Sequence, residues 1–183
     1  MKNHINSVAE ISLKDFPVSF NVLFTDALDE KHFTNKLKAR KRLVGMGKTI
    51  LPQIHKLLTS GNGTLRREAT KIVELIADPK SIPFLINMLD DIEFDIRWIA
   101  AEGLIKIGRR SIIPQLMALR DGKSSLFMDE GAHHVLNGLL FKNEKEELIP
   151  LMRSLENLHE LRETVPVEAY KALKTVFRSK TGI

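Results

Sequence analysis

Two adjacent histidines, His133 and His134, are the residues of this chain whose type and spacing best suit metal or acid–base chemistry. Asp129 precedes His133 by four residues and Glu130 precedes His134 by four, so each pair shares one face of a helix. The two imidazoles point about 100° apart on a helix, which makes them poor partners for a single metal ion. The pattern therefore favours a structural role, with His133 hydrogen-bonded in a seam between helical units and His134 at the surface.

Motifs for catalysis are absent from the sequence. It contains no glycine-rich phosphate loop, no Gly-x-Ser-x-Gly turn and no His-Glu-x-x-His pair. It also contains no cysteine, which excludes disulfides, thiolate-bound metals and a cysteine nucleophile. We expect no catalytic residue and no cofactor, and the residues favour a non-enzymatic protein over an enzyme.

Proline marks the elements that position these side chains. Four prolines are followed by apolar residues at helical spacing and lie 31, 31 and 36 residues apart: Pro52, Pro83, Pro114 and Pro150. Because proline has no amide hydrogen and its φ is already helical, it suits the first turn of a helix. Each proline therefore predicts the start of a helix.

A second pattern alternates with the prolines and is built on alanine. An aliphatic residue follows each alanine by four positions and another apolar residue follows by three more, as in Ala100, Leu104 and Ile107. This spacing forms one stripe of a helix, and the small alanine lets a neighbouring helix approach closely. The same template fits at Ala39, Ala69, Ala132 and Ala169. Gly47 and Gly108, just beyond two of these stripes, are expected to end their helices.

Two helical patterns that alternate with a period near 31 residues are typical of an α-solenoid, in which each hairpin buries its apolar face by stacking on the next. We predict one all-α domain over residues 1–183, a right-handed superhelix of stacked antiparallel hairpins. An N-terminal cap is expected at 1–29, four hairpins at about 30–60, 61–91, 92–122 and 123–158, and a C-terminal capping region at 159–183 with an unpaired helix at about 164–178. An insertion is expected near residues 142–145.

The run from Phe94 to Gly108 resembles the short HEAT-like repeat that also occurs in phycobilin lyases, and residues 64–69 are a second copy. Residues 130–136 resemble a run in bacterial HEAT-repeat proteins, a similarity that brings no activity with it. The resemblance covers about residues 30–178 and implies an armadillo-like superhelix. It also implies that Arg66 and Arg97, three residues before their alanines, bridge neighbouring repeats.

In HEAT-like solenoids the second helix of each hairpin lines the concave side, so the positions after each proline are the expected binding surface. These positions predict a partly apolar trough for a peptide or helix of a protein partner. The residues expected to bind are Gln53, Phe84, Ile86, Asn87, Gln115, Met117 and Leu151. We expect a protein-binding scaffold or adaptor, with a phycobilin-lyase-like or other enzyme-associated subunit as the alternative.

A second expected surface is centred on Trp98, the single tryptophan of the chain. Its place in the repeat is outside the alanine stripe, so part of its indole should lie on the outer face of its helix. Stacking of successive repeats would bring Trp98 and Glu102 beside Glu130 and His134. Such a patch suits a protein interface, although the pattern favours a tryptophan that covers the gap between two helices.

The formal net charge of +5 raises nucleic acid as a further alternative partner. Residues 1–60 hold ten Lys or Arg against five Asp or Glu, and the rest of the chain is balanced. The excess comes from a basic cluster of Lys36, Lys38, Arg40, Lys41, Arg42 and Lys48. Because no aromatic residues are interleaved for base stacking and no later repeat extends the cluster, the pattern disfavours nucleic acid.

No apolar stretch follows the first charged residues, as a secretory signal would require. The chain nowhere approaches the roughly 18 consecutive apolar residues of a membrane-spanning helix. We therefore expect a cytoplasmic protein without a membrane partner.

Overall fold

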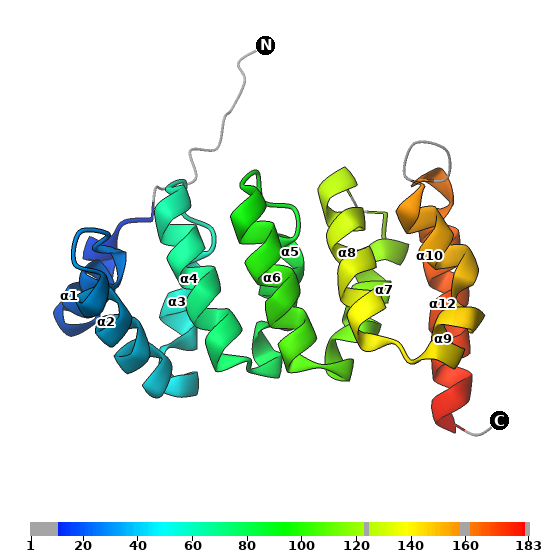
Figure 1. Cartoon of the computed structure of the whole chain (residues 1–183), viewed down its shortest axis with the longest axis horizontal. Coiled ribbons are helices and arrows are strands. Elements are labelled where there is room, and N and C mark those ends of the chain that lie inside the picture. Colours follow the sequence, from blue (N-terminus) through cyan, green and yellow to red (C-terminus); the bar gives the residue numbers. More distant parts are fainter. Residues whose placement is uncertain (1–10, 123–124, 158–161, 182–183) are drawn as a thin grey trace, which may run out of the picture. The chain divides into compact units, whose positions relative to one another are not determined.

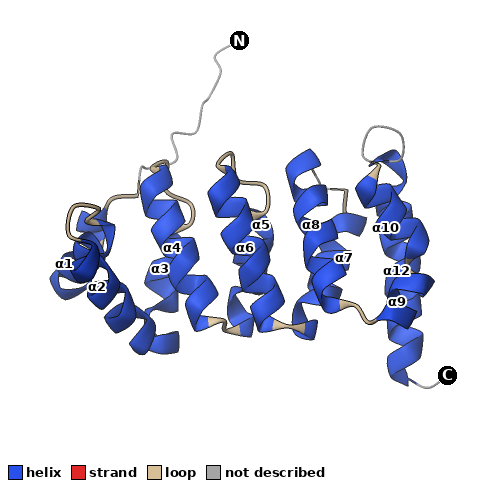
Figure 2. Cartoon of the chain, viewed as in Figure 1, coloured by secondary structure: helices blue, strands red, loops and turns tan. Residues whose placement is uncertain are grey.

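Long and short helices alternate over residues 33–139 (Figures 1 and 2). The structure is a computed structural model that describes residues 11–122, 125–157 and 162–181. Within these ranges the regular elements are α-helices and short 3-10 helices, without a strand. The expected all-α solenoid class is confirmed. The right-handed sense of the superhelix stays a prediction.

The chain forms two compact units, Met1–Ile72 and Val73–Ile183, which divide inside helix α4. The first unit contains η1 (Leu13–Asp15), α1 (Val18–Leu28), α2 (Phe33–Gly45), η2 (Gly47–Ile50), α3 (Leu51–Leu57) and the beginning of α4 (Gly63–Ile76). The second unit contains the end of α4, then η3 (Pro79–Ser81), α5 (Ile82–Met88), α6 (Phe94–Ile107), η4 (Arg109–Ser111), α7 (Ile112–Arg120), α8 (Leu126–Leu139), α9 (Lys142–Glu147), α10 (Ile149–Glu156), η5 (Arg162–Thr164) and α12 (Val165–Thr181). The predicted repeat boundaries stay a prediction. Because long and short helices alternate, a repeat can be defined to begin with either kind of helix.

Proline begins the short helices, as predicted. Pro52, Pro83 and Pro150 are the second residues of α3, α5 and α10, and Pro114 is the third residue of α7. A 3-10 turn precedes each of α3, α5 and α7. These turns connect the three short helices to the long helices α2, α4 and α6. Gly108 ends α6 with a φ of 86°, a backbone conformation that favours glycine.

The long helices pack through the predicted alanine stripe. Ala69, Ala100, Ala132 and Ala169 are fully buried, and Ala39 is nearly so. Glycine brings the helices of the second unit closer still: a Cβ on Gly103 of α6 would lie 3.0 Å from Leu85 Cδ1 of α5. The stripe is therefore buried in both units, and in the second unit it is the surface through which neighbouring helices make contact.

The last helix differs from the expectation. The predicted unpaired helix is wrong, because α12 packs against both α7 and α10. Val165 and Ala169 of α12 lie fully buried in one apolar core with residues of α7, α8 and α10, such as Leu116, Leu136 and Leu155. The amphipathic stripe of α12 thus closes this core as the partner of α10.

The predicted insertion forms the short helix α9, which Arg109 ties to the preceding repeat. The Arg109 guanidinium donates two hydrogen bonds to the Glu144 carboxylate and one, of 3.2 Å, to the Leu139 carbonyl. It also lies 4.7 Å from the centre of the Phe141 ring. The hydrogen bonds from Arg109, together with that from the Phe141 amide, hold the pKa of Glu144 below its usual value.

Acid should weaken this tie. Because the pKa of Glu144 is lowered in the folded chain, its contribution to stability is present above about pH 4.5 and is lost as pH falls through the lowered value. The difference in unfolding free energy between wild type and Glu144→Gln should shrink from pH 7 to pH 3, by at most about 1 kcal/mol because solvent screens the pair. Urea unfolding followed by circular dichroism measures it. Glu147→Gln, an exposed change on the same helix, is the control, and an equal pH trend for both variants contradicts the assignment.

Candidate functional site

A group of exposed aromatic and charged side chains on α6 and α8 forms the candidate functional site. We call it the aromatic patch, and it consists of Phe94, Arg97, Trp98, Phe127, Glu130 and His134. With Ala101 and Gly131 these residues line a pocket of about 140 Å³. Phe94 is 64% exposed, Trp98 49% and Phe127 38%. Large aromatic surfaces of this kind are costly to leave in water and are a mark of interaction sites.

Arg97 is the centre of the aromatic patch. Its guanidinium carbon lies 3.9 Å from the centre of the Phe127 ring and 5.5 Å from that of Phe94, so it stacks between two rings. The same guanidinium donates hydrogen bonds of 2.9 and 3.2 Å to the carbonyls of Asp91 and Ile92. Arg97 thereby fixes the turn before α6 and both phenylalanine rings at once.

Trp98 is held from the other side by the histidine of the next long helix. The indole and the His134 imidazole lie with their ring centres 4.7 Å apart, and the Phe94 and Trp98 rings are 6.4 Å apart. The His134 Nε2 forms a 2.9 Å hydrogen bond with the Glu102 carboxylate, which orients the imidazole against the indole. The aromatic side chains are therefore held in place before any partner arrives.

The structure brings together the residues expected around Trp98. Glu102 and His134 are in direct contact, and Glu130 lines the same pocket as Trp98. Phe94 and Phe127 were not among the residues expected around Trp98. Arg97 was expected to bridge neighbouring repeats and not to belong to this surface. The spacing of Phe94 and Trp98, four residues apart on one helix, was a signal for a shared face.

Arg66 and Arg97 play equivalent parts in their repeats. Arg66 donates hydrogen bonds to the carbonyls of Ser60 and Gly61, as Arg97 does to those of Asp91 and Ile92. In the fourth repeat the same position holds Asp129, which is fully buried.

The two histidines turn toward different neighbours. His133 Nε2 lies 3.2 Å from Glu156 of α10, in the seam between α8 and α10, while His134 pairs with Glu102 of α6. Among residues 11–122, 125–157 and 162–181, no group of three His, Asp or Glu side chains is placed to hold a metal ion.

The residues expected on the concave side divide into two groups. Asn87 and Met117 are exposed, and Gln53 and Phe84 are partly exposed. The predicted exposure of the other three is wrong, because Ile86, Gln115 and Leu151 are 6%, 0% and 2% exposed. Leu151 belongs to the core that α12 closes, so part of the expected apolar trough is a packing surface between helices.

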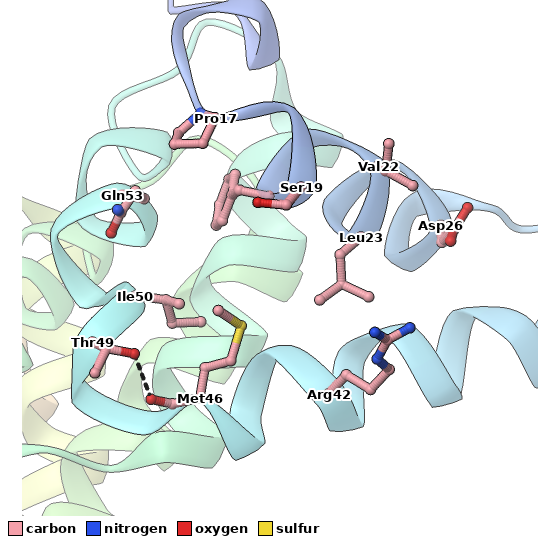
Figure 3. Close-up of a pocket in the computed structure, with 11 residues that line it drawn as sticks. Pro17, Ser19, Val22, Leu23, Asp26, Arg42, Met46, Thr49, Ile50 and Gln53 are labelled. Carbon is pink, nitrogen blue, oxygen red and sulfur yellow. Dashed lines mark hydrogen bonds between the residues drawn. The ribbon is translucent and has the colours of Figure 1, made fainter.

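A larger groove lies in the first unit, between α1, α2 and α3 (Figure 3). Its volume is about 600 Å³, and Leu23 of α1 points toward Met46 across the groove. The Thr49 hydroxyl donates a 2.7 Å hydrogen bond to the Met46 carbonyl and so fixes the turn below it. The other lining residues are Pro17, Ser19, Phe20, Asp26, Arg42 and Gln53. The groove is mostly apolar and carries one acid and one base.

Ion pairs occupy part of the basic cluster. Arg40 forms two hydrogen bonds of 2.6 Å to the carboxylate of Glu68, which is only 4% exposed. Lys36 lies 2.8 Å from Glu30 and lowers the pKa of that carboxyl. Arg42 lines the groove of the first unit, while Lys38, Lys41 and Lys48 are exposed. The cluster is therefore partly neutralised and does not form a uniform cationic surface.

Residues 50–136 match a protein family described as HEAT repeats. This match supports the expected HEAT-like repeats, which are commonly scaffolds for protein interactions. The finer likeness to the repeats of phycobilin lyases stays a prediction. A search of curated proteins finds no matching sequence. Among the helices that the structure describes, none has the length and apolar character needed to cross a membrane.

The Arg40–Glu68 pair predicts that this part of the basic cluster stabilises the fold. Arg40→Met should lower the free energy of unfolding by about 3 kcal/mol, because it leaves the buried Glu68 carboxylate without its charged partner. Lys41→Met, an exposed change on the same helix, should cost less than about 0.5 kcal/mol. The double change Arg40→Met with Glu68→Met should recover most of the loss. Urea unfolding compares the three variants, and equal costs for Arg40→Met and Lys41→Met contradict this role.

Proposed function

We propose that the protein is a non-enzymatic scaffold or adaptor that binds a protein partner through the aromatic patch. The observation that carries the proposal is a set of three exposed rings: Phe94 and Phe127 lie against the Arg97 guanidinium, and Trp98 lies between Phe94 and His134. Aromatic residues and arginine are enriched at protein interfaces, and Trp, Tyr and Arg supply most of the residues that dominate the binding energy.

Rigidity supports the same proposal. Arg97 is held by two backbone carbonyls and two rings, and Trp98 is held by an imidazole that Glu102 orients. A partner that docks on ordered side chains avoids the entropy cost of ordering them, which is about 0.5–1.5 kcal/mol for each flexible side chain. The HEAT repeats of residues 50–136 are consistent with such a role.

The other candidate surfaces receive less support. Three of the seven residues expected on the concave side are buried, and Asn87 and Met117 supply the exposed part. The nucleic-acid alternative loses Lys36 and Arg40 to ion pairs with carboxylates. An enzyme-associated role rests on the resemblance to phycobilin lyases alone. The cysteine-free sequence favours a cytoplasmic location for the scaffold.

Affinity capture from a native lysate tests the patch directly. The double variant Phe94→Ser with Trp98→Ala should retain less than about a tenth of the partner that wild type captures, because it removes two exposed anchor rings. Tyr170→Ala removes an exposed ring on α12 and should leave capture unchanged. Circular dichroism confirms that each variant is folded. Equal capture by wild type and the patch variant overturns the proposal.

A further inference from the structure

Acidic residues surround the aromatic patch, in a protein whose net charge is +5. The two segments that build the patch, residues 90–102 and 125–134, contain seven Asp or Glu, of which Asp91 and Asp129 are buried, and a single Lys or Arg, Arg97. Since Arg97 is stacked between two rings and hydrogen-bonded to two carbonyls, its charge is already engaged within the patch. The patch therefore carries an acidic border around an aromatic centre.

The acids of this border are placed where a partner can meet them. Asp90, Glu93, Asp95 and Glu130 are exposed, and Glu102 is partly exposed. Asp95 lies in the first turn of α6, where the positive end of the helix dipole stabilises a carboxylate. Glu102 and Glu130 lie beyond the first turns of α6 and α8, so the helix dipole does not account for them. Glu102 is paired with His134, and the exposed Glu130 carboxylate adds negative charge to the surface of the patch.

The pocket within the patch has room for one side chain. Its volume of about 140 Å³ is below the roughly 300–1,000 Å³ of pockets that hold cofactors or drug-sized ligands. The rings of Phe94, Trp98, Phe127 and His134 form most of its walls, and Arg97, Ala101, Glu130 and Gly131 complete the lining. Ile92 and Leu126, which are 82% and 39% exposed, add apolar surface on the turns and helix ends that carry the patch. A single aliphatic anchor suits this lining.

We propose that the occupant of the aromatic patch is a positively charged amphipathic segment of a partner protein. One aliphatic side chain of that segment enters the pocket, and its Lys or Arg side chains lie over Asp95, Glu102 and Glu130. This inference rests on the proposed function and adds the chemistry of the partner. Charge complementarity favours a basic segment over an acidic one, because like charges placed opposite each other across an interface cost several kcal/mol.

Trp98 reports on the patch because it is the single tryptophan of the chain. Three synthetic helical peptides without aromatic residues serve as probes: a Lys/Leu peptide with leucine at i, i+3, i+4 and i+7, its Glu/Leu counterpart, and a Lys/Ser peptide of the same charge without leucine. The Lys/Leu peptide should shift Trp98 emission to shorter wavelength and saturate. The other two should bind at least about tenfold more weakly, because each lacks either the charge or the anchor.

Charge reversal supplies the matched control. Asp95→Lys with Glu130→Lys should weaken binding of the Lys/Leu peptide at least about tenfold. Glu146→Lys with Glu147→Lys, two exposed changes on α9 outside the patch, should leave it within about twofold. Equal binding of the Lys/Leu and Glu/Leu peptides, equal loss in both double variants, or an unchanged Trp98 emission overturns the inference. If these results are found while capture still depends on Phe94 and Trp98, the proposed function stands and the basic partner is wrong.

Discussion

In the second unit of this protein a single helix hairpin has an apolar stripe that it cannot bury alone, and the close stacking of successive hairpins there is the interaction on which the candidate site depends. Alanine and glycine make the stacking possible. Ala100 and Ala132 are fully buried, and a Cβ on Gly131 would lie 3.0 Å from Leu89 Cδ2. Larger side chains at these positions would separate the helices and expose the leucines of the core to water.

The same close approach creates the candidate site. Residues about one repeat apart in the sequence become neighbours: His134 contacts Glu102 and Trp98, and Phe127 covers Arg97. None of these side chains belongs to the buried stripe, so they could diverge from the repeat pattern without loss of the core. The surface of α6 and α8 thus combines a rigid support with side chains that are free to serve recognition.

Periodicity predicted the parts of this structure that recur. The prolines begin the short helices, the alanine stripe is buried, and the register of the repeats placed Trp98 beside His134. Periodicity does not predict how each short helix is rotated about its own axis, and therefore which of its faces is buried. Helix α5 has only seven residues, most of them apolar, so its sequence does not distinguish the buried face of Ile86 from a free one.

Two further features depend on contacts that no repeat encodes. Arg40 looked like one of several solvated bases, and its partner Glu68 lies 28 residues away at a position where the repeats vary. The pairing of α12 with α7 and α10 follows from the core that all three helices share with α8, which becomes visible only when the chain is folded.

Hydrogen exchange on the complex with a captured partner tests whether the aromatic patch is the binding surface. If it is, amides of residues 92–102 and 125–134, which include the first halves of α6 and α8, should exchange more slowly when the partner is bound, while α3, α5 and α7 are unchanged. Slower exchange in α3, α5 and α7, with α6 and α8 unaffected, would contradict it and place the binding surface on the proline-led helices.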